Sequence, residues 1–205
     1  MKRALCSLLV VSATFAEAEG GWLSARGRLQ PDLRLEAWAG SRTAGLGVVF
    51  PDAPGAMAGI GAEVLYAFFD RTLELRGARV WQLTKNRLAT ASTTVGASAH
   101  LVPSAFDLGL GPHAGLNLAL GGETFTFDFG LQTGVEVFVT SQVVRLPQRL
   151  LLGADLRLGQ FGVGLHLRGG VDLVPGHGFV GRGEATLSFS WFVAQQSPPP
   201  PTTRG

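Results

Sequence analysis

The sequence is short of the residues that normally cover a water-soluble domain. Charged residues make up 16% of its 205 positions, compared with roughly 25% in ordinary soluble domains. Of its seventeen basic residues, only Lys2 and Lys85 are lysines. Soluble proteins usually carry flexible, well-hydrated lysines on their surface, so this shortage indicates that little of the chain forms a conventional wet surface.

Cysteine is almost absent as well. The single cysteine, Cys6, lies in an N-terminal segment that has the pattern of a secretory signal peptide. Two basic residues come first, an apolar core follows at residues 4–15, and Ala16 to Ala18 form a small-x-small cleavage site. The sequence therefore predicts a signal peptide over residues 1–18. The mature chain then has no cysteine, which excludes disulfides and thiol catalysis.

The chain also lacks a marked charge excess and a long apolar run. Once residues 1–18 are removed, fifteen basic and fourteen acidic residues remain, so the net charge is +1. This balance, and the absence of basic runs interleaved with aromatic residues, argues against a nucleic-acid partner. The apolar core at residues 4–15 is too short to span a bilayer as a helix, and no export-blocking apolar helix follows it.

Two-residue alternation, by contrast, is abundant. The stretch Thr124–Thr140 reads TFTFDFGLQTGVEVFVT, with mostly apolar residues at odd positions and residues such as Asp128 and Glu136 at even positions. This pattern is typical of a β-strand with one apolar face and one polar face. It recurs between turns from Leu33 to Phe192, without a convincing amphipathic helix, and it predicts an all-β meander of hairpins.

The predicted number of strands is eight to ten. Eight strands follow Met57 and two shorter ones precede it, and closed single-chain barrels use even numbers. Ten fits slightly better, because apolar residues occupy odd positions up to Ala39 and even positions from Ala44 onward. A turn between these two residues requires such a change. The predicted organisation is a signal peptide at 1–18, a lead-in at 19–31, a closed antiparallel up-and-down transmembrane β-barrel at 32–193 and a Pro-rich disordered tail at 194–205.

Two segments depart from the regular pattern. The run SQVVRLPQR at 141–149 predicts a longer loop, and LATASTTVGASAHLV at 88–102 is the weakest predicted strand because both of its faces are small and mixed. The predicted connections are mostly two to nine residues long. Since binding functions are concentrated on long, irregular loops, short connections disfavour a large receptor or adhesin.

Alternation alone does not say which face looks into the barrel, but the polar faces are unusually small. Gly109, Gly111 and Gly115 share a face with Asp107, and several glycines share one with His166. A narrow barrel interior must fit every inward side chain. On the apolar faces of the predicted strands, charged residues occur only at strand ends, as a lipid-facing wall requires. These features favour the polar face inside.

Charges on the polar parity then form a predicted ion network in the lumen, because desolvated charges need partners of opposite sign. Its candidate members are Arg34, Glu36, Glu63, Glu74, Arg76, Asp107, Asp128, Glu136, Asp155, Arg157, His166, Arg168, Asp172, Arg182 and Glu184. A barrel of eight or ten strands with these side chains inside is expected to be largely plugged.

The N-terminal signal, the train of alternating strands and the final aromatic strand ATLSFSWF resemble the small outer-membrane β-barrel proteins of Gram-negative bacteria. In that family the assembly machinery reads a last strand that ends in an aromatic residue. The resemblance implies an outer-membrane location, contact with lipid, and an assembly signal made of Leu187, Phe189, Trp191 and Phe192. Two features depart from the family. Thirteen residues follow Phe192, whereas the family's last strand usually ends the chain. In addition, Phe192 shares a strand face with Ser188 and Ser190, which leaves Trp191 as the lipid-facing terminus.

Motifs for chemistry are weak, and the sequence predicts no catalytic residue, no metal site and no cofactor. His166 shares a face with Arg168 and Asp172, as an acid/base or metal cluster would, but a lone inward histidine in an ion network is commoner. Ser98 and His100 also share a face. Lipid A deacylases, which are small outer-membrane barrels, have the reverse order, His-x-Ser, and no orienting carboxylate is evident here. His113 is expected in the lumen and His177 in an exposed loop.

Three functional hypotheses follow. The first is a small, non-enzymatic outer-membrane barrel with a structural or envelope-maintenance role, or a narrow channel. The second is a barrel enzyme that acts on lipid A or envelope peptides, with Ser98 and His100 as its candidate groups. The third is a soluble periplasmic β-barrel that binds an apolar ligand within its apolar face. In the first two, the Pro-rich tail is expected on the periplasmic side, within reach of a periplasmic partner.

Overall fold

The computed structural model describes residues 32–194, apart from residues 54, 55, 85, 87, 123 and 177 and the side chain of Arg182. The predicted signal peptide and lead-in, and all but the first residue of the predicted tail, lie outside the described residues. Within the described residues, no helix is long and apolar enough to cross a membrane.

The described chain is almost entirely strand. The elements are β1 (Leu33–Gly40), β2 (Thr43–Pro51), β3 (Ala58–Ala67), β4 (Thr72–Gln82), β5 (Ala89–Val102), the short 3₁₀ helix η2 (Pro103–Ala105), β6 (Asp107–Gly121), β7 (Phe125–Gly134), β8 (Glu136–Phe138), β9 (Val144–Leu158), β10 (Phe161–Val174) and β11 (Gly178–Val193). The weakly patterned segment before η2 is thus a full strand, β5.

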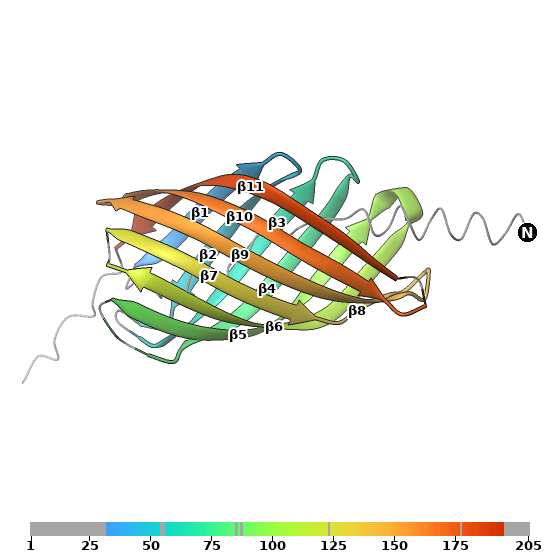
Figure 1. Ribbon diagram of the computed structural model, residues 1–205, viewed down its shortest axis with the longest axis horizontal. Coiled ribbons are helices and arrows are strands. Elements are labelled where there is room, and N and C mark those ends of the chain that lie inside the picture. The colour runs from blue at the N-terminus through green and yellow to red at the C-terminus, as the bar shows by residue number, and fades with distance from the viewer. Residues whose placement is uncertain are drawn as a thin grey trace, which may run out of the picture.

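These strands form one closed antiparallel barrel (Figure 1). Each strand pairs with its neighbours in the chain, and β11 pairs back onto β1, which closes the ring. Strands β7 and β8 both pair with β6 on one side and β9 on the other, so together they are one barrel strand. The barrel therefore has ten strands, and the predicted all-β, closed, up-and-down architecture is confirmed.

The ring closes unevenly at β11. Strand β1 pairs only with Thr186–Val193, which is the second half of β11, whereas β10 pairs with residues 178–191 of β11. The turn after β1 comes early, so the wall is lower there than at the hairpin of β10 and β11. We call the end where β1 begins and β11 finishes the terminal end of the barrel, and the opposite end the distal end.

Two prolines explain the interruption between β7 and β8. Pro147 on β9 lies between the register pairs Thr133–Gln148 and Glu136–Arg145, and proline has no N–H to donate to a sheet. On the other side of the interruption, Val135 N donates to the carbonyl of Pro112 at 3.0 Å. Pro112 has no N–H with which to return that hydrogen bond. The predicted loop at 141–149 is correct for residues 141–143 and wrong from Val144 onward, where β9 begins, because Pro147 interrupts the alternation around it.

The strands are staggered around the barrel. Register partners followed from Leu35 through all ten strands return to the line of β1 at position 47, a stagger of twelve residues. Strands in such barrels tilt by roughly 40° from the barrel axis. Side chains that are far apart in the sequence therefore meet at the same height in the lumen.

The polar face of the strands looks into the barrel and the apolar face looks out. On β6, for example, Leu116 is 59% exposed and its neighbour Asn117 is 4% exposed. The same alternation holds along β7, where Asp128 and Gln132 are buried between exposed residues. The outer wall is consequently a surface of leucine, valine, alanine and phenylalanine.

Exposed aromatic side chains gather near the two ends of this wall. Towards the terminal end they are Phe50, Trp81, Phe125, Phe127, Phe129, Phe161, Phe189 and Trp191, and towards the distal end Tyr66, Phe68, Phe69, Phe106 and Phe179. Between the two groups the outward residues are mainly aliphatic. The barrel thus carries an aliphatic band with an aromatic group at each end.

Candidate functional site

The lumen holds the charged residues of the barrel. Of the fifteen predicted network residues, fourteen have described side chains, and each of these is buried or half-buried inside the barrel. The exception is Arg182, which lies on β11 and whose side chain is outside the described part. The structure divides the fourteen among several separate groups of contacts.

The largest group, which we call the distal cluster, lies nearer the distal end. It consists of Glu63, Glu74, Arg76, His100, Glu136, Arg145, Arg149 and Asp172, contributed by β3, β4, β5, β8, β9 and β10. Arg145 is 1% exposed and contacts three other members of the cluster, Glu136, Asp172 and His100.

Arg145 bridges two carboxylates and a histidine. Its Nε donates to Glu136 Oε2 at 3.0 Å, and its Nη2 contacts the same oxygen. Its Nη1 lies 3.5 Å from Asp172 Oδ2, and its Nη2 lies 2.7 Å from His100 Nδ1. The guanidinium also stacks over the Phe138 ring at 5.2 Å. One cation therefore holds β5, β8, β9 and β10 together.

Arg76 and Arg149 complete the distal cluster. Arg76 Nε donates to Glu74 Oε1 at 2.5 Å and its Nη1 lies 3.7 Å from Glu63 Oε1, while Arg149 Nη1 pairs with Asp172. The cavity between Arg76, Glu136 and Arg149 has a volume of about 10 Å³, close to the smallest space that holds one water molecule. The side chains of these three residues therefore leave little open space between them.

Glycines on β6 allow this cluster to form. Gly111 lies between Ser98 on β5 and Glu136 on β8 in the register, and Ser98 Oγ donates to Glu136 Oε1 at 3.1 Å across it. A Cβ atom at Gly111 would be 1.7 Å from the Val135 carbonyl oxygen. At Gly109, a Cβ atom would meet the Phe138 ring at 2.8 Å. The inward glycines thus let side chains from non-adjacent strands meet.

An apolar layer covers the distal cluster. Val102, Phe138 and Val174 each lie two residues beyond His100, Glu136 and Asp172 on the same strands and faces, towards the distal end. They are 2%, 1% and 4% exposed. The charged cluster is therefore shielded from solvent at the distal end as well as at its sides.

A second group of charges lies at the terminal end. Arg34 Nη2 donates to Glu36 at 3.0 Å and to Ser190 Oγ at 3.0 Å. Arg157 Nη2 pairs with Asp32 at 2.7 Å, and its guanidinium stacks over the ring of Phe192 at 4.1 Å. Phe192 is buried in the lumen as its parity predicts, whereas Trp191 points outward and is 49% exposed.

His166, Arg168 and Asp172 share a face, but each has a different partner. His166 Nε2 lies 3.3 Å from Asp155 Oδ2, the Arg168 guanidinium stacks over Trp38 at 5.2 Å, and Asp172 belongs to the distal cluster. The three side chains therefore do not form the common acid/base or metal cluster that their spacing suggested as an alternative.

Ser98 and His100 meet the same carboxylate, Glu136, which sequence spacing did not reveal. His100 Nδ1 lies 3.9 Å from Glu136 Oε2 and faces the Arg145 guanidinium. In a nucleophile–base pair the hydroxyl donates to the imidazole, whereas here Ser98 Oγ donates to the carboxylate. Ser98 and His100 are 6% and 0% exposed. This geometry matches a buried structural network better than an activated serine.

Two further predicted residues stabilise turns. Glu184 accepts hydrogen bonds from Thr43 Oγ1 and from the backbone N–H of Arg42 at 3.1 Å, next to the turn after β1. Asp107 accepts backbone N–H bonds from Leu108, Thr140 and Ser141 at the distal rim, at 2.9, 2.8 and 3.1 Å. Asp128 is buried on β7. Glu184 and Asp107 therefore stabilise turns and are not members of the distal cluster.

The sequence did not identify three members of the distal cluster as part of the ion network. Arg145 and Arg149 lie in the segment predicted as a loop, and His100 was considered only as a catalytic candidate. Ser98 and His100 are two positions apart on one strand, so their side chains lie on the same face. Assigning that face to the lumen would therefore have placed His100 inside the barrel.

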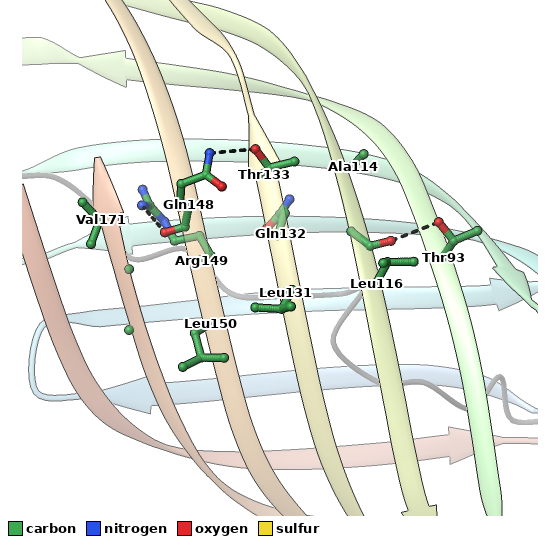
Figure 2. Close-up of a pocket in the computed structure, with 13 residues that line it drawn as sticks. Thr93, Ala114, Leu116, Leu131, Gln132, Thr133, Gln148, Arg149, Leu150 and Val171 are labelled. Carbon is green, nitrogen blue, oxygen red and sulfur yellow. Dashed lines mark hydrogen bonds between the residues drawn. The ribbon is translucent and has the colours of Figure 1, made fainter. Parts of the chain in front are cut away.

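The outer wall carries a groove of about 700 Å³ over β5, β6, β7, β9 and β10 (Figure 2). Its walls include the outward side chains of Leu116, Leu131 and Leu150. Within it, Gln148 Nε2 donates to Thr133 Oγ1 at 2.7 Å. Figure 2 shows these two polar side chains facing each other. The groove is therefore mainly apolar, and two further hydrogen bonds lie among its residues, from Thr93 Oγ1 to the Gly115 carbonyl at 3.0 Å and from Arg149 Nη1 to the Gln148 carbonyl at 3.3 Å.

No family model matches the sequence, and no curated protein matches it.

Proposed function

We propose that this protein is an integral outer-membrane β-barrel with a structural, non-enzymatic role in the envelope, and that its lumen is plugged rather than open. The observation that carries the proposal is the orientation of the two faces: charged side chains are buried inside the barrel, and an aliphatic band covers its outside. Lipid is the solvent in which this arrangement is favourable, because burying a leucine side chain away from water gains about 1.5–3 kcal/mol.

The distribution of outward charge supports a lipid environment. Among the described outward strand positions, Arg79 is the one charged residue. Its guanidinium reaches Asp52 in the turn after β2, with Nη1 2.7 Å from Oδ1. A charge in the middle of a bilayer costs roughly 2–4 kcal/mol but little at the interface. An arginine paired with a carboxylate beside the terminal end fits that gradient.

The aromatic groups at the two ends of the wall support the same placement. Membrane barrels carry an outward apolar band flanked by aromatic girdles at both interfaces. Here Trp81 and Trp191 lie near the terminal end, and Tyr66 and Phe179 lie near the distal end. The band between them is leucine-rich, as the hydrocarbon region requires.

The plugged lumen favours a structural role over a channel or an enzyme. The distal cluster leaves a cavity of about 10 Å³ between Arg76, Glu136 and Arg149, and an apolar layer covers it. Ions need a continuous hydrated path, and the small cavity together with the apolar layer supports the proposal that the lumen does not provide one. We therefore expect no conductance when the purified protein is added to a planar bilayer, and steady single-channel currents would contradict the plug.

Fluorophore accessibility tests the membrane placement. Because the mature chain expected from the signal peptide has no cysteine, single-cysteine variants are easily labelled after reconstitution into vesicles. We expect a label at Leu116→Cys to be quenched by brominated lipid and not by an aqueous quencher. The matched control, Ser104→Cys in the exposed η2 turn, should show the reverse. Quenching of the Leu116 label from water, with the protein in the soluble periplasmic extract, would favour the soluble barrel instead.

A further inference from the structure

We propose that Glu74, His100 and Glu136 form a binding site for a divalent transition-metal ion, best matched to zinc, inside the barrel lumen. The proposal requires the barrel and its inward polar face, and it does not depend on placement in a membrane. It goes beyond the structural role proposed above, because it assigns a specific ligand to the distal cluster.

The three side chains converge from three strands. Glu74 on β4 and His100 on β5 are direct register partners, and Glu136 on β8 reaches over the glycines of β6. One potential ligand atom from each lies within 4.8 Å of the others. That spacing places three donors around a single point, as a coordination sphere requires.

The donor set suits zinc. One imidazole nitrogen and two carboxylate oxygens are common zinc ligands, and three protein ligands leave a fourth position for water. The three residues are 1%, 0% and 3% exposed. Ser98 Oγ donates to Glu136 Oε1 at 3.1 Å, and such outer contacts fix the orientation of a ligating carboxylate.

An unsatisfied atom points to a missing partner. Glu74 Oε1 accepts from Arg76 Nε at 2.5 Å, but Glu74 Oε2 has no hydrogen-bond partner although it is buried. Buried polar atoms without a partner are uncommon, and a carboxylate oxygen is among the most costly to leave so. A metal ion bound between Glu74 and its two neighbours satisfies this oxygen.

The local charge balance admits a cation. The carboxylates are Glu63, Glu74, Glu136 and Asp172, and the guanidinium groups are Arg76, Arg145 and Arg149, which leaves one carboxylate in excess when His100 is neutral. Arg145 is the competitor, because its Nη2 contacts Glu136 and lies 2.7 Å from His100 Nδ1. Asp172, 3.5 Å from Arg145 Nη1, offers the guanidinium an alternative carboxylate. A metal ion and Arg145 therefore compete for Glu136.

The first experiment measures zinc retained by the folded protein. Because the ligands are buried, the full chain is refolded into detergent with zinc present, passed through a desalting column and analysed for metal. Folding is checked by a compact band in unboiled SDS gels. We expect about one zinc per barrel, and Glu74→Gln and His100→Asn to lower zinc affinity at least about tenfold. His166→Asn is the matched control, since His166 is a buried lumen histidine beside a different carboxylate.

A second variant separates metal binding from a purely structural role. If zinc and Arg145 compete for Glu136, Arg145→Gln should bind zinc at least about tenfold more tightly. In EDTA this variant should lose its compact band at a lower temperature than the wild type, and zinc should restore that temperature. A structural network without metal binding would leave Arg145→Gln weakened to the same degree with and without zinc.

The proposal is overturned by any of three results. These are no zinc above the level of Glu74→Gln, an equal loss in His166→Asn, or no zinc-dependent recovery of Arg145→Gln. If His100→Asn gives no compact band, Glu74→Gln, which preserves side-chain volume, decides the outcome. Failure of the wild-type protein to give a compact band would count against the barrel itself, and so is distinguishable from failure of the metal site.

Discussion

Arg145 and Glu136 are register partners on β9 and β8, and they form a salt bridge immediately beyond the break between β7 and β8. The pair lies where two prolines interrupt the sheet, so side chains take over part of the connection between neighbouring strands. Both residues are almost fully buried, at 1% and 3% exposure. The salt bridge therefore connects β8 to β9 next to the interruption of the sheet, and it also lies at the centre of the distal cluster.

Removing one partner of this salt bridge should destabilise the barrel strongly. We expect Glu136→Gln, measured in EDTA, to lower the free energy of unfolding by about 3–5 kcal/mol, because Arg145 is left as a buried charge with one carboxylate fewer. Urea titration of the detergent-solubilised protein provides the measurement. The double variant Glu136→Gln with Arg145→Gln should lose less than the two single losses together. Additive losses would show that the pair is not energetically coupled.

A side chain at Gly111 should disturb the distal cluster. A Cβ atom there would be 1.7 Å from the Val135 carbonyl oxygen, so Gly111→Ala must shift the backbone of β6 or of Val135, between β7 and β8. We expect a loss of about 1–3 kcal/mol in unfolding free energy, as for other overpacked interiors. Gly77→Ala is the matched control, because its nearest atom would be 4.0 Å away. Equal effects of the two substitutions would contradict the close packing over β6.

Two substitutions on β4 should report the solvent around the wall. In lipid vesicles, Leu75→Arg should cost about 2–4 kcal/mol, because it would place a charge within the aliphatic band between the two aromatic groups. Arg79→Leu, nearer the terminal end and paired with Asp52, should change stability by no more than about 1 kcal/mol. Urea unfolding from vesicles measures both. A soluble barrel would tolerate Leu75→Arg within about 0.5 kcal/mol, as at other surface sites.

Trp191 and Phe192 should have separable roles at the end of β11. Trp191 points outward and Phe192 points into the lumen under Arg157. If the last strand is the assembly signal, Trp191→Ala should reduce the amount of heat-modifiable barrel in cell envelopes. Phe192→Ala should still assemble but should lower the free energy of unfolding by about 3 kcal/mol or more. The opposite division between the two variants would place the assembly signal on the inward residue.

The architecture was predictable because the period of a strand is two. Leu116 and Asn117 fall on opposite faces by parity alone, and the parity flip between Ala39 and Ala44 indicated the hairpin that makes the strand number ten. Alternation along a strand does not, however, indicate how far along the barrel axis each side chain lies. The contact between Ser98 and Glu136 depends on register across β6, which is set by strand stagger and by glycines that no local pattern positions.

The missed residues have a similar physical origin. Pro147 breaks the alternation of β9, so Arg145 and Arg149 were assigned to a loop although the strand continues through them. His166 was identified, but its partner Asp155 lies on the neighbouring strand β9 and depends on pairing. Sequence thus indicated which side chains enter the lumen, whereas their partners follow from the stagger of the closed ring.

The early turn after β1 has a consequence for the motion of the wall. Residues 186–191 of β11 are paired with strands on both sides, whereas residues 178–185 are paired with β10 alone within the described chain. Backbone amides of the first half that point away from β10 have no strand to receive them. We therefore expect backbone amides in the distal half of β11 to exchange faster than those in its terminal half. The pairing between β1 and β11 is then the place where the ring opens first.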